Sequence, residues 1–492
     1  MAALRSAILL ASSALAGCSL LLDTEEFREQ VDATRVRIDV VMPARVSEGS
    51  TAPILLQGEG FLADDLVRAV IDTEQGPMEA SVLARQLGAD GESMAVLVSV
   101  PVLADYDPGA GPWPLVLTVV QGPTQAQGDL VVDPLPELTL SGGSVDTATL
   151  APLYSRIDIS AATVLTGVGP ARLVATQSIR VNGALDASGA GATDAVGGAG
   201  GPGGCAGGGS GEPGQCAGGG AAGATGVDAD GPGAGGGGGC GVGAQAGGGV
   251  GGGDQGADAC TEPLVPLGVA GNRGGGGGGG GVGQGQPGGG GGGSGGVIEL
   301  SAPRLVLNAP VMARGGDGAP GAVVDCAGGV YGGGGGGGSG GVVLVRTDEL
   351  LVNQESLISA GNGVGAQTCD ADGGDGGDGR VRLDIGGLDS GAGVAEVGDV
   401  VDFFGGEVWY GPRLPPDTPA LARAGAVAFQ VRGDPDVGYE LQVDEDPAQP
   451  VNGGGRLVLV LEPGLRHVCA RVPGEDPDLS ESRHCVSVAV VP

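Results

Sequence analysis

The chain repeats one pattern, which reads GGVIELSAPRLVLNAPVMARGGDG over residues 295–318 and GGVVLVRTDELLVNQESLISAGNG over residues 340–363. A third copy, ARLVATQSIRVNGALDASGAG, spans Ala171–Gly191. Each copy holds three short runs of β-forming residues, and a single copy cannot bury its apolar face alone. The repeat therefore predicts stacked units. Three matched pairs lie 45 positions apart: Val297 and Val342, Leu305 and Leu350, Asn308 and Asn353.

Three short strands with a turn after each describe one coil of a right-handed parallel β-helix, which we predict for residues 150–405. A coil needs roughly 20 to 25 residues, so a 45-residue period must extrude a loop. The excess always follows the third run, so the glycine-rich loops leave the helix at one corner, on one side. These loops are residues 188–294, 315–340 and 361–379. Further coils or caps are expected at residues 156–160, 164–166, 380–385 and 397–404.

Glycine makes up 109 of the 492 residues, much of it in runs such as Gly274–Gly281 and Gly332–Gly338. The runs lack the Gly-X-Y period of collagen. They resemble regions where extended polyglycine strands pack side by side into hydrogen-bonded bundles. The alternative is a flexible, linker-like coil, and the sequence leaves both open.

Alternating β patterns flank this region on both sides, so the chain as a whole is predicted to be all-β. Residues 36–135 suit a small β-sandwich, with strands near 36–41, 54–57, 67–71, 95–100 and 115–120. Residues 412–419 read as a proline-rich linker. Residues 420–492 suit a second, immunoglobulin-like or fibronectin-like sandwich, with strands near 427–432, 439–444, 457–461, 467–472 and 485–490.

Two further stretches carry family resemblances. PILLQGEGFLADD, with Gly58, Gly60 and Phe61, and the later VSVPVL resemble the IPT/TIG group of immunoglobulin-like domains. That resemblance implies a spacer or binding module without catalytic residues. GGGSGGVIEL and GGGSGGVVLV resemble glycine-rich β-helix surface proteins of environmental bacteria.

The N-terminus predicts export. Arg5 precedes the apolar segment Ala7–Ala16, which is too short to span a bilayer and is typical of a secretory signal. The sequence Leu15-Ala16-Gly17-Cys18 resembles the lipobox of bacterial lipoproteins, whose cysteine is lipidated after cleavage. The alternative is a plain cleaved signal. The resemblance implies a signal peptide at 1–18 and, because Ser19 is not aspartate, an outer-membrane location. Residues 19–35 are polar and acidic after a short apolar stretch, which indicates a tether.

The formal net charge of −35 and the absence of lysine make nucleic acid and anionic membrane surfaces poor partners. The acidity is spread along the chain, which favours a role in solubility, with cation binding as the alternative. One candidate loop, CDADGGDGGDG, alternates acids with glycines, and calcium takes oxygen ligands from flexible acidic loops. The string lacks the closing glutamate of an EF-hand, so a solvated loop is the other interpretation. The candidate ligands are Asp370, Asp372, Asp375 and Asp378; no other cofactor is expected.

Eight cysteines remain beside Cys18, and an exported chain is free to form disulfides. Cys326 and Cys369 are the single cysteines of two loops expected to be neighbours, so we predict that they pair. Within the long first loop we favour the local pairs among three connectivities, and the last two cysteines are expected to bridge the final strands. The remaining predicted pairs are Cys205–Cys216, Cys240–Cys260 and Cys469–Cys485. No CxxC pair suggests a zinc site.

Enzymatic motifs are weak. GxSxG occurs around Ser294 and Ser339, but polyglycine generates this string by composition, and the only histidines, His467 and His484, lie in the C-terminal segment. Polysaccharide lyases and glycosidases of the β-helix fold are the rival class, although no lysine base or pair of acids is evident. We therefore expect a non-enzymatic protein with an envelope-structural, adhesive or cell-surface contact role, arranged as anchor, spacer, stalk and distal sandwich. Surface polysaccharide and other envelope proteins are the expected partners, on the periplasmic or the extracellular face.

Lipidation at Cys18 is directly testable. Cys18→Ala removes the thiol that carries the acyl chains, so the variant should be released in soluble or unprocessed form instead of remaining membrane-bound. Membrane fractionation with fatty-acid labelling measures this. A variant that is still acylated and membrane-bound would refute the assignment.

Overall fold

The chain is all-β in the computed structural model. The structure describes residues 35–492 apart from 75, 104–110, 217–218, 225–246, 248–274, 353–355, 386–387, 390–401, 405–406, 416–417, 434–437 and 474–482. One short 3₁₀ helix, η1 (Thr147–Thr149), is the only helix among the described residues. Cys18, the signal segment and the residues of the tether before Arg35 lie outside the described part of the chain.

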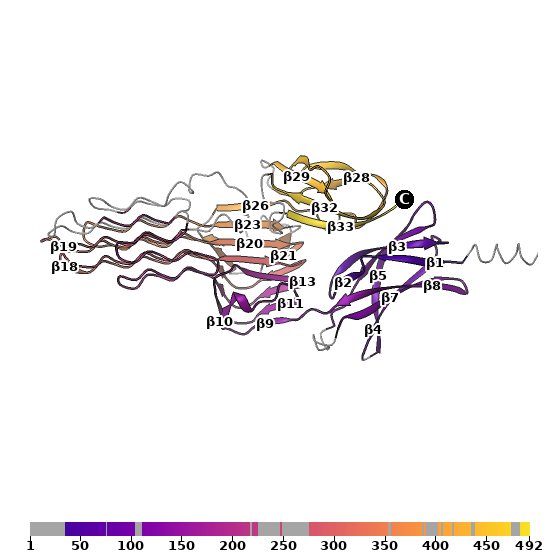
Figure 1. The fold of residues 1–492 in the computed structure, drawn as a ribbon, viewed down its shortest axis with the longest axis horizontal. Helices are drawn as coiled ribbons and strands as arrows, with labels where there is room; N and C mark the ends of the chain where they lie inside the picture. The colour runs from indigo at the N-terminus through magenta and orange to yellow at the C-terminus, as the bar shows by residue number, and fades with distance from the viewer. Residues whose placement is uncertain are drawn as a thin grey trace, which may run out of the picture.

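The middle of the chain is a stack of coils, here called the coil stack (residues 138–410), in which strands of successive coils pair in parallel (Figure 1). The first runs are β13 (Ala171–Val181), β15 (Val297–Ser301), β20 (Val342–Thr347), β23 (Arg380–Ile385) and β26 (Glu407–Tyr410). The second runs are β9 (Leu138–Leu140), β11 (Tyr154–Ile159), the second half of β13, β16 (Arg304–Leu307), β21 (Glu349–Val352) and β24 (Leu388–Asp389). The third runs are β10 (Gly143–Asp146), β12 (Thr163–Thr166), β14 (Leu185–Asp186), β17 (Val311–Met312), β22 (Leu357–Ser359) and β25 (Asp402–Phe404).

The strand register follows the sequence repeat. Val297 pairs with Val342, and Leu305 pairs with Leu350, as the 45-residue alignment predicts. In the third sheet Val311 pairs with Ile358 instead, because the second copy has two more residues before its third run. Asn353 lies outside the described residues. Stacking begins at β9 and β10, which pair with β11 and β12, so the coils start ahead of residue 150.

Columns of aliphatic side chains run through the core of the coil stack. Ala171, Ile298, Val343 and Val381 are register partners on consecutive strands, and all four are 0% exposed. A parallel column contains Leu173, Leu300, Val345 and Leu383. Burying each Val, Leu or Ile side chain is worth about 1.5–3 kcal/mol, so the columns hold successive coils in one register.

The N-terminal unit is an eight-stranded antiparallel arrangement with one parallel pair, β2 beside β8. Three of its strands, β2, β5 and β8, are not predicted by the sequence pattern, and β2 has only three residues. The side chains of β5 are mostly exposed, and β8 places small Ala126 and Gly128 at inward positions, so neither strand shows a strong apolar alternation. The strands are β1 (Arg37–Met42), β2 (Arg45–Ser47), β3 (Thr51–Glu59), β4 (Leu66–Thr73), β5 (Gly76–Leu87), β6 (Ser93–Ser99), β7 (Trp113–Gln121) and β8 (Thr124–Asp133).

The C-terminal unit consists of a five-stranded sheet and a two-stranded sheet packed around Tyr439, Leu441 and Val468. Two of its strands, β27 and β30, were not expected, because one has three residues and the other contains Pro450. The strands are β27 (Leu421–Arg423), β28 (Gly425–Gln430), β29 (Gly438–Val443), β30 (Gln449–Asn452), β31 (Arg456–Leu461), β32 (Gly464–Arg471) and β33 (Arg483–Val491).

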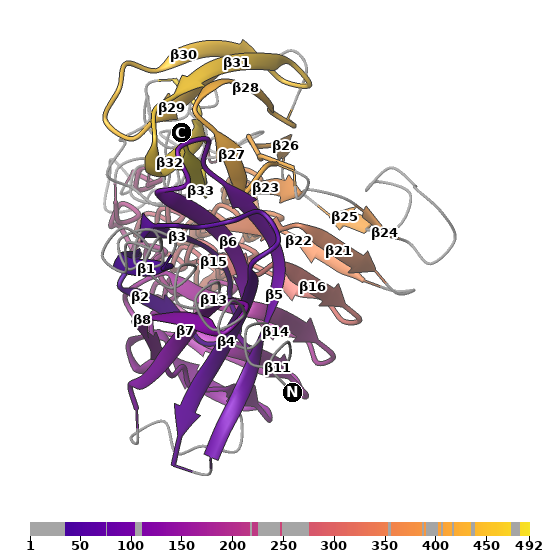
Figure 2. The same cartoon turned by 90° about the vertical axis from the view of Figure 1, so that its right-hand side faces the viewer.

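The C-terminal unit is not distal, which corrects the expected linear arrangement. Leu55 and Ala95 of the N-terminal unit form one buried cluster with Ala489 and Val491 of β33. At the edge of this contact, Ala89 N donates a hydrogen bond to the Pro492 carbonyl at 2.9 Å. Figure 2 shows β33 beside β3 and β6. The contact arises because β3 and β6 bury apolar side chains on both faces, a pattern that needs a second layer.

Candidate functional site: the glycine arm

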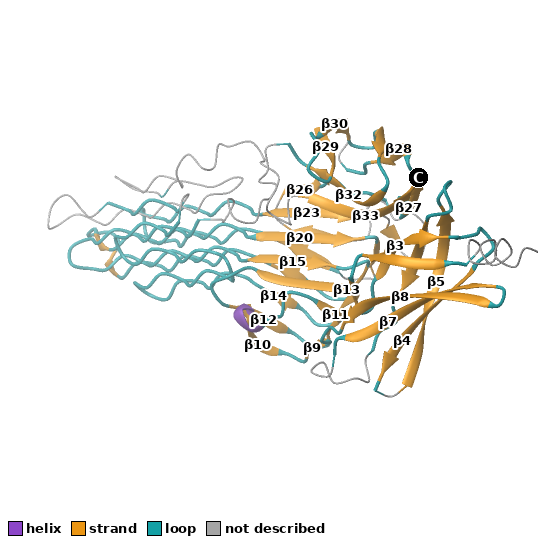
Figure 3. Ribbon diagram, turned by 45° about the vertical axis from the view of Figure 1, so that its right-hand side comes forward, coloured by secondary structure: helices purple, strands orange, loops and turns teal. Residues whose placement is uncertain are grey.

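The glycine-rich loops leave the coil stack together as one elongated bundle. We call the described part of this bundle the glycine arm; it comprises residues 187–216, 219–224, 275–296, 313–341 and 360–379. Figure 3 shows its chains lying side by side beyond the strands, and Figure 1 places the short hairpin β18 (Val323–Asp325) and β19 (Val330–Tyr331) at its tip. The loops thus extend from one corner, as the repeat predicts. In the described residues they are ordered, hydrogen-bonded segments and not a flexible linker.

Hydrogen bonds in the arm recur every three residues. Along one chain, the amides of Gly289, Gly292 and Gly295 donate to the carbonyls of 333, 336 and 339. The amides of the residues that follow two of these, Gly290 and Gly293, donate to the carbonyls of residues 194 and 190, which belong to a different segment of the arm. A period of three is that of a polyproline II helix, which has no internal hydrogen bonds and leaves every amide available to a neighbour.

Carbonyls of the same chain accept from still other neighbours. Gly291, Gly292 and Gly293 accept from the amides of residues 198, 277 and 316, respectively. The Gly291 amide donates to residue 208. One central chain is therefore hydrogen-bonded to passes of the backbone on all sides, which satisfies its buried polar groups without side chains.

Only glycine fits the central positions. A Cβ atom on Gly289, Gly291 or Gly292 would lie 1.7, 2.0 or 1.9 Å from a backbone oxygen of a neighbouring chain. At the outer surface the constraint disappears. A Cβ on Gly191 would meet nothing closer than 3.5 Å, and the outer chains accordingly carry alanine, proline, valine and aspartate.

The candidate calcium ligands have a different role in this geometry. The Oδ1 atoms of Asp372, Asp375 and Asp378 accept the backbone amides of residues 368, 365 and 362 at 2.7, 2.8 and 3.2 Å. Carboxylates three residues apart in a chain that rises about 3.1 Å per residue are separated by roughly 9 Å, so they cannot share one ion. Asp370 is exposed at the neighbouring turn. Among the described residues, no group of three or more His, Cys, Asp or Glu side chains is arranged to hold a metal ion.

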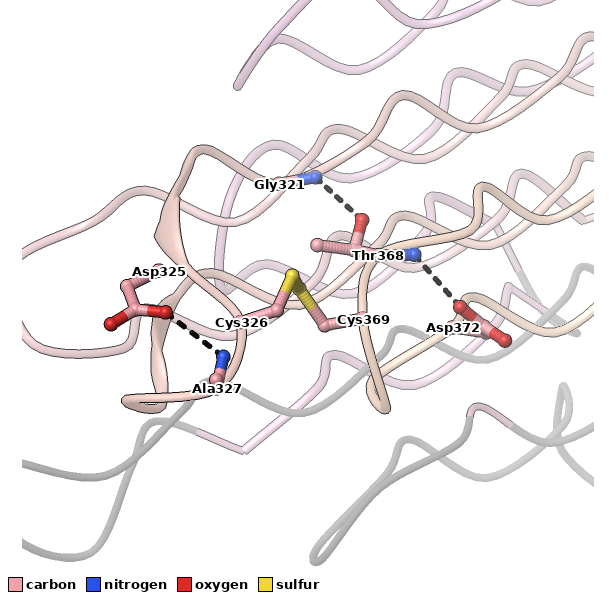
Figure 4. Close-up of a disulfide and its surroundings, with 7 residues drawn as sticks. All are labelled: Gly321, Asp325, Cys326, Ala327, Thr368, Cys369 and Asp372. Carbon is pink, nitrogen blue, oxygen red and sulfur yellow. Dashed lines mark hydrogen bonds between the residues drawn. A yellow bond between two sulfur atoms is a disulfide. The ribbon is translucent and has the colours of Figure 1, made fainter.

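Sequence reasoning missed these aspartates as supports for the backbone, although their three-residue spacing matches the helical period. It also missed Asp317, whose Oδ1 accepts the Val364 amide at 2.9 Å, and Thr368, whose Oγ1 accepts the Gly321 amide at 3.0 Å. Both bonds join the loops of consecutive coils, and Figure 4 shows the Thr368 contact next to Asp372. Polar side chains thus serve where the outermost amides lack a backbone partner.

Disulfides join the loops at defined places. Cys326 is bonded to Cys369, with Cα atoms 5.6 Å apart, and this bridge links the tips of two successive loops (Figure 4). Cys205 is bonded to Cys216 within the first loop. The third bridge, Cys469–Cys485, joins β32 and β33. These are three of the four pairs expected from the sequence; Cys240 and Cys260 lie outside the described residues.

The GxSxG serines belong to the bundle. Ser294 and Ser339 are 0% exposed, and Ser294 Oγ accepts the Cys205 amide at 2.7 Å. His467 and His484 stand on β32 and β33 of the C-terminal unit. A serine enclosed by backbone in this way has no room for a substrate carbonyl.

No family model, curated protein or solved structure matches this chain. The described residues contain no helix that is long and apolar enough to cross a bilayer.

Gly291→Ala should open the bundle, because its Cβ would overlap a backbone oxygen. Overpacking of this kind costs about 1–3 kcal/mol or more. We expect arm peptides to lose protection in hydrogen exchange while peptides of the coil stack keep it. Gly191→Ala is the matched control and should be neutral or slightly stabilising. Equal protection in the two variants would contradict the packing.

The Cys326–Cys369 bridge closes a loop of 43 residues, for which chain entropy gives about 4 kcal/mol of stabilisation. Non-reducing peptide mapping should recover a linked peptide containing both cysteines. The double variant Cys326→Ser and Cys369→Ser should make the tip of the arm more sensitive to proteolysis. A peptide linking either cysteine to residues 205–260 would show that the loops are arranged differently.

Proposed function

We propose that this chain is a lipid-anchored outer-membrane protein that presents a rigid glycine arm for structural or adhesive contact at the cell envelope. The observation that carries the proposal is the shape of the described chain. The first strand, β1, lies near one end of the long axis, and the tip hairpin β18–β19 lies at the other (Figure 1). An anchor at Cys18, joined to β1 by a short tether, would leave the arm pointing away from the membrane.

The construction of the arm supports contact rather than catalysis. Its central chains are stiffened by hydrogen bonds to neighbours on several sides, and its outer surface carries small and apolar groups such as Val196, Val323, Val324 and Val364, which are 49–69% exposed. Exposed apolar side chains near a rigid tip favour a protein or glycan contact.

The proposal includes a finer assignment of the fold. Three strands per coil, parallel pairing and aliphatic columns support a right-handed β-helix for the coil stack. The two flanking units are proposed to be immunoglobulin-like sandwiches, of which the first matches the IPT/TIG pattern around Gly60 and Phe61. Gly60 has φ +76° and Phe61 is buried, as a strand-to-turn motif requires.

Protease shaving of intact cells tests the location. The wild-type chain should be digested while a periplasmic marker survives, and Cys18→Ala should be missing from the cell surface. Protection of the chain until the outer membrane is permeabilised would contradict a surface role.

Adhesion tests the arm itself. Cells displaying Gly291→Ala should bind abiotic or cellular surfaces more weakly than cells displaying Gly191→Ala at equal surface density. Equal binding would exclude the arm as the contact element.

A further inference from the structure

A cavity of about 770 Å³ lies where the three units of the chain meet. Its wall is built from β2 and β3 of the N-terminal unit, the turn Ser301–Pro303 of the coil stack, residues 413–415, 418 and 420, and β32 and β33 of the C-terminal unit. In Figure 1, β33 lies above β2 and close to the ends of the upper coil strands. The volume falls in the range of about 300–1,000 Å³ that is typical of ligand sites.

The lining of the cavity has more basic than acidic side chains, unlike the chain as a whole. Arg45, Arg346, Arg413 and Arg483 line it, against two carboxylates, Asp133 and Asp348. The chain as a whole carries 58 acidic against 23 basic residues. Both histidines of the sequence, His467 and His484, also line this wall. A local excess of cations in an acidic protein favours an anionic ligand.

The arginines differ in how they are engaged. Arg45 is paired with Asp133, and Arg413 with Asp348. Arg346 is buried, with Nε 3.1 Å from Asp384 Oδ2 and Nη1 3.6 Å from Glu299 Oε1. The Arg483 side chain, which is only partly buried, has no hydrogen bond or ion pair in the described part of the chain. Among the described residues of the wall, Arg483 is therefore the arginine left available to a ligand.

His484 reports a positive potential at the same wall. Burial lowers the pKa of His484 well below its usual range, and the guanidinium groups of Arg413 and Arg346 lower it further. Its Nδ1 accepts the Leu414 amide at 3.1 Å, so the neutral ring carries its proton on Nε2 and can act as a donor. The imidazole thus adds a neutral hydrogen-bond donor beside the arginines.

We propose that this cavity binds a short acidic saccharide, with its carboxylate held by the Arg483 guanidinium. Guanidinium groups bind carboxylates through paired, charge-assisted hydrogen bonds. Further serine and threonine residues line the wall and suit a hydroxyl-rich ligand: Ser47, Thr51, Ser301 and Thr418. Ser50 Oγ already donates to the Ser47 carbonyl, and Ser487 Oγ lies 3.1 Å from His467 Nδ1. The cavity is larger than a free phosphate requires, and the described wall has no Phe, Tyr or Trp side chain, so charge and hydroxyl contacts carry the recognition.

Isothermal titration calorimetry on the detergent-solubilised full chain tests this site, with trigalacturonate as the probe. We expect binding that weakens as salt rises and no binding of a neutral trisaccharide. A titration with inorganic phosphate tests whether a small anion alone is enough for binding. Phosphate binding as tight as that of trigalacturonate would overturn the saccharide assignment, and a failure of trigalacturonate to bind would overturn the site.

Three variants locate the contact. Arg483→Gln should weaken trigalacturonate binding about tenfold, which corresponds to about 1.4 kcal/mol. Arg423→Gln, an exposed arginine of the same unit outside the cavity, should bind like the wild type. Asp348→Asn should tighten binding several-fold because it removes a repulsive carboxylate. Equal affinity of Arg483→Gln and Arg423→Gln, or no gain in Asp348→Asn, would overturn the proposal. This outcome is independent of the arm, since adhesion is measured with Gly291→Ala.

Discussion

Hydrogen bonding between backbones that carry no Cβ is the constraint on which the glycine arm depends. Ordering each residue costs about 1–2 kcal/mol of backbone entropy, and glycine loses the most. A hydrogen bond returns only about 0.5–1.5 kcal/mol net. The margin is therefore small, and the bundle forms only where nearly every amide and carbonyl of a central chain finds a partner, as around Gly291 and Gly292.

That narrow margin explains the supports at the surface of the arm. The Cys326–Cys369 bridge reduces the entropy of the unfolded loops. Asp372, Asp375 and Asp378 each cap one amide of the antiparallel neighbouring chain. At the root of the arm, the loops leave the ends of β14, β17 and β22 and return into β15, β20 and β23. The columns of buried aliphatic residues hold those strands in register, so the chains of the arm begin already aligned.

The junction of the three units follows a different physics. There the apolar contact of Leu55 and Ala95 with Ala489 and Val491 brings the two flanking units together. Their loops and the turn at Ser301–Pro303 then enclose polar groups that the contact itself does not use. Arg346 lies buried beside Glu299 and Asp384. Arg45 and Arg413 each have a carboxylate partner, so Arg483 is the cavity arginine that the described residues leave to a ligand.

The sequence by itself determined the coil register, the direction of the loops and the pairing of Cys326 with Cys369. All three follow from one periodicity, which places the first and second runs of the two copies 45 residues apart, although the third run is displaced by two residues. Strands with weak alternation, such as β5 and β8, could not be read, since their neighbours rather than their own pattern stabilise them.

Only the tertiary structure decided whether polyglycine is a bundle or a coil. The amides of a polyglycine run can hydrogen-bond to water or to neighbouring backbone segments. Which of the two occurs depends on how many segments surround the run. The hydrogen bonds of the acidic loop and the position of the C-terminal unit depend on the tertiary structure in the same way. Asp375 accepts the Gly365 amide of a neighbouring backbone segment, and Val491 packs in one cluster with Leu55 of the N-terminal unit. Neither contact can be predicted from the composition of the sequence around these residues.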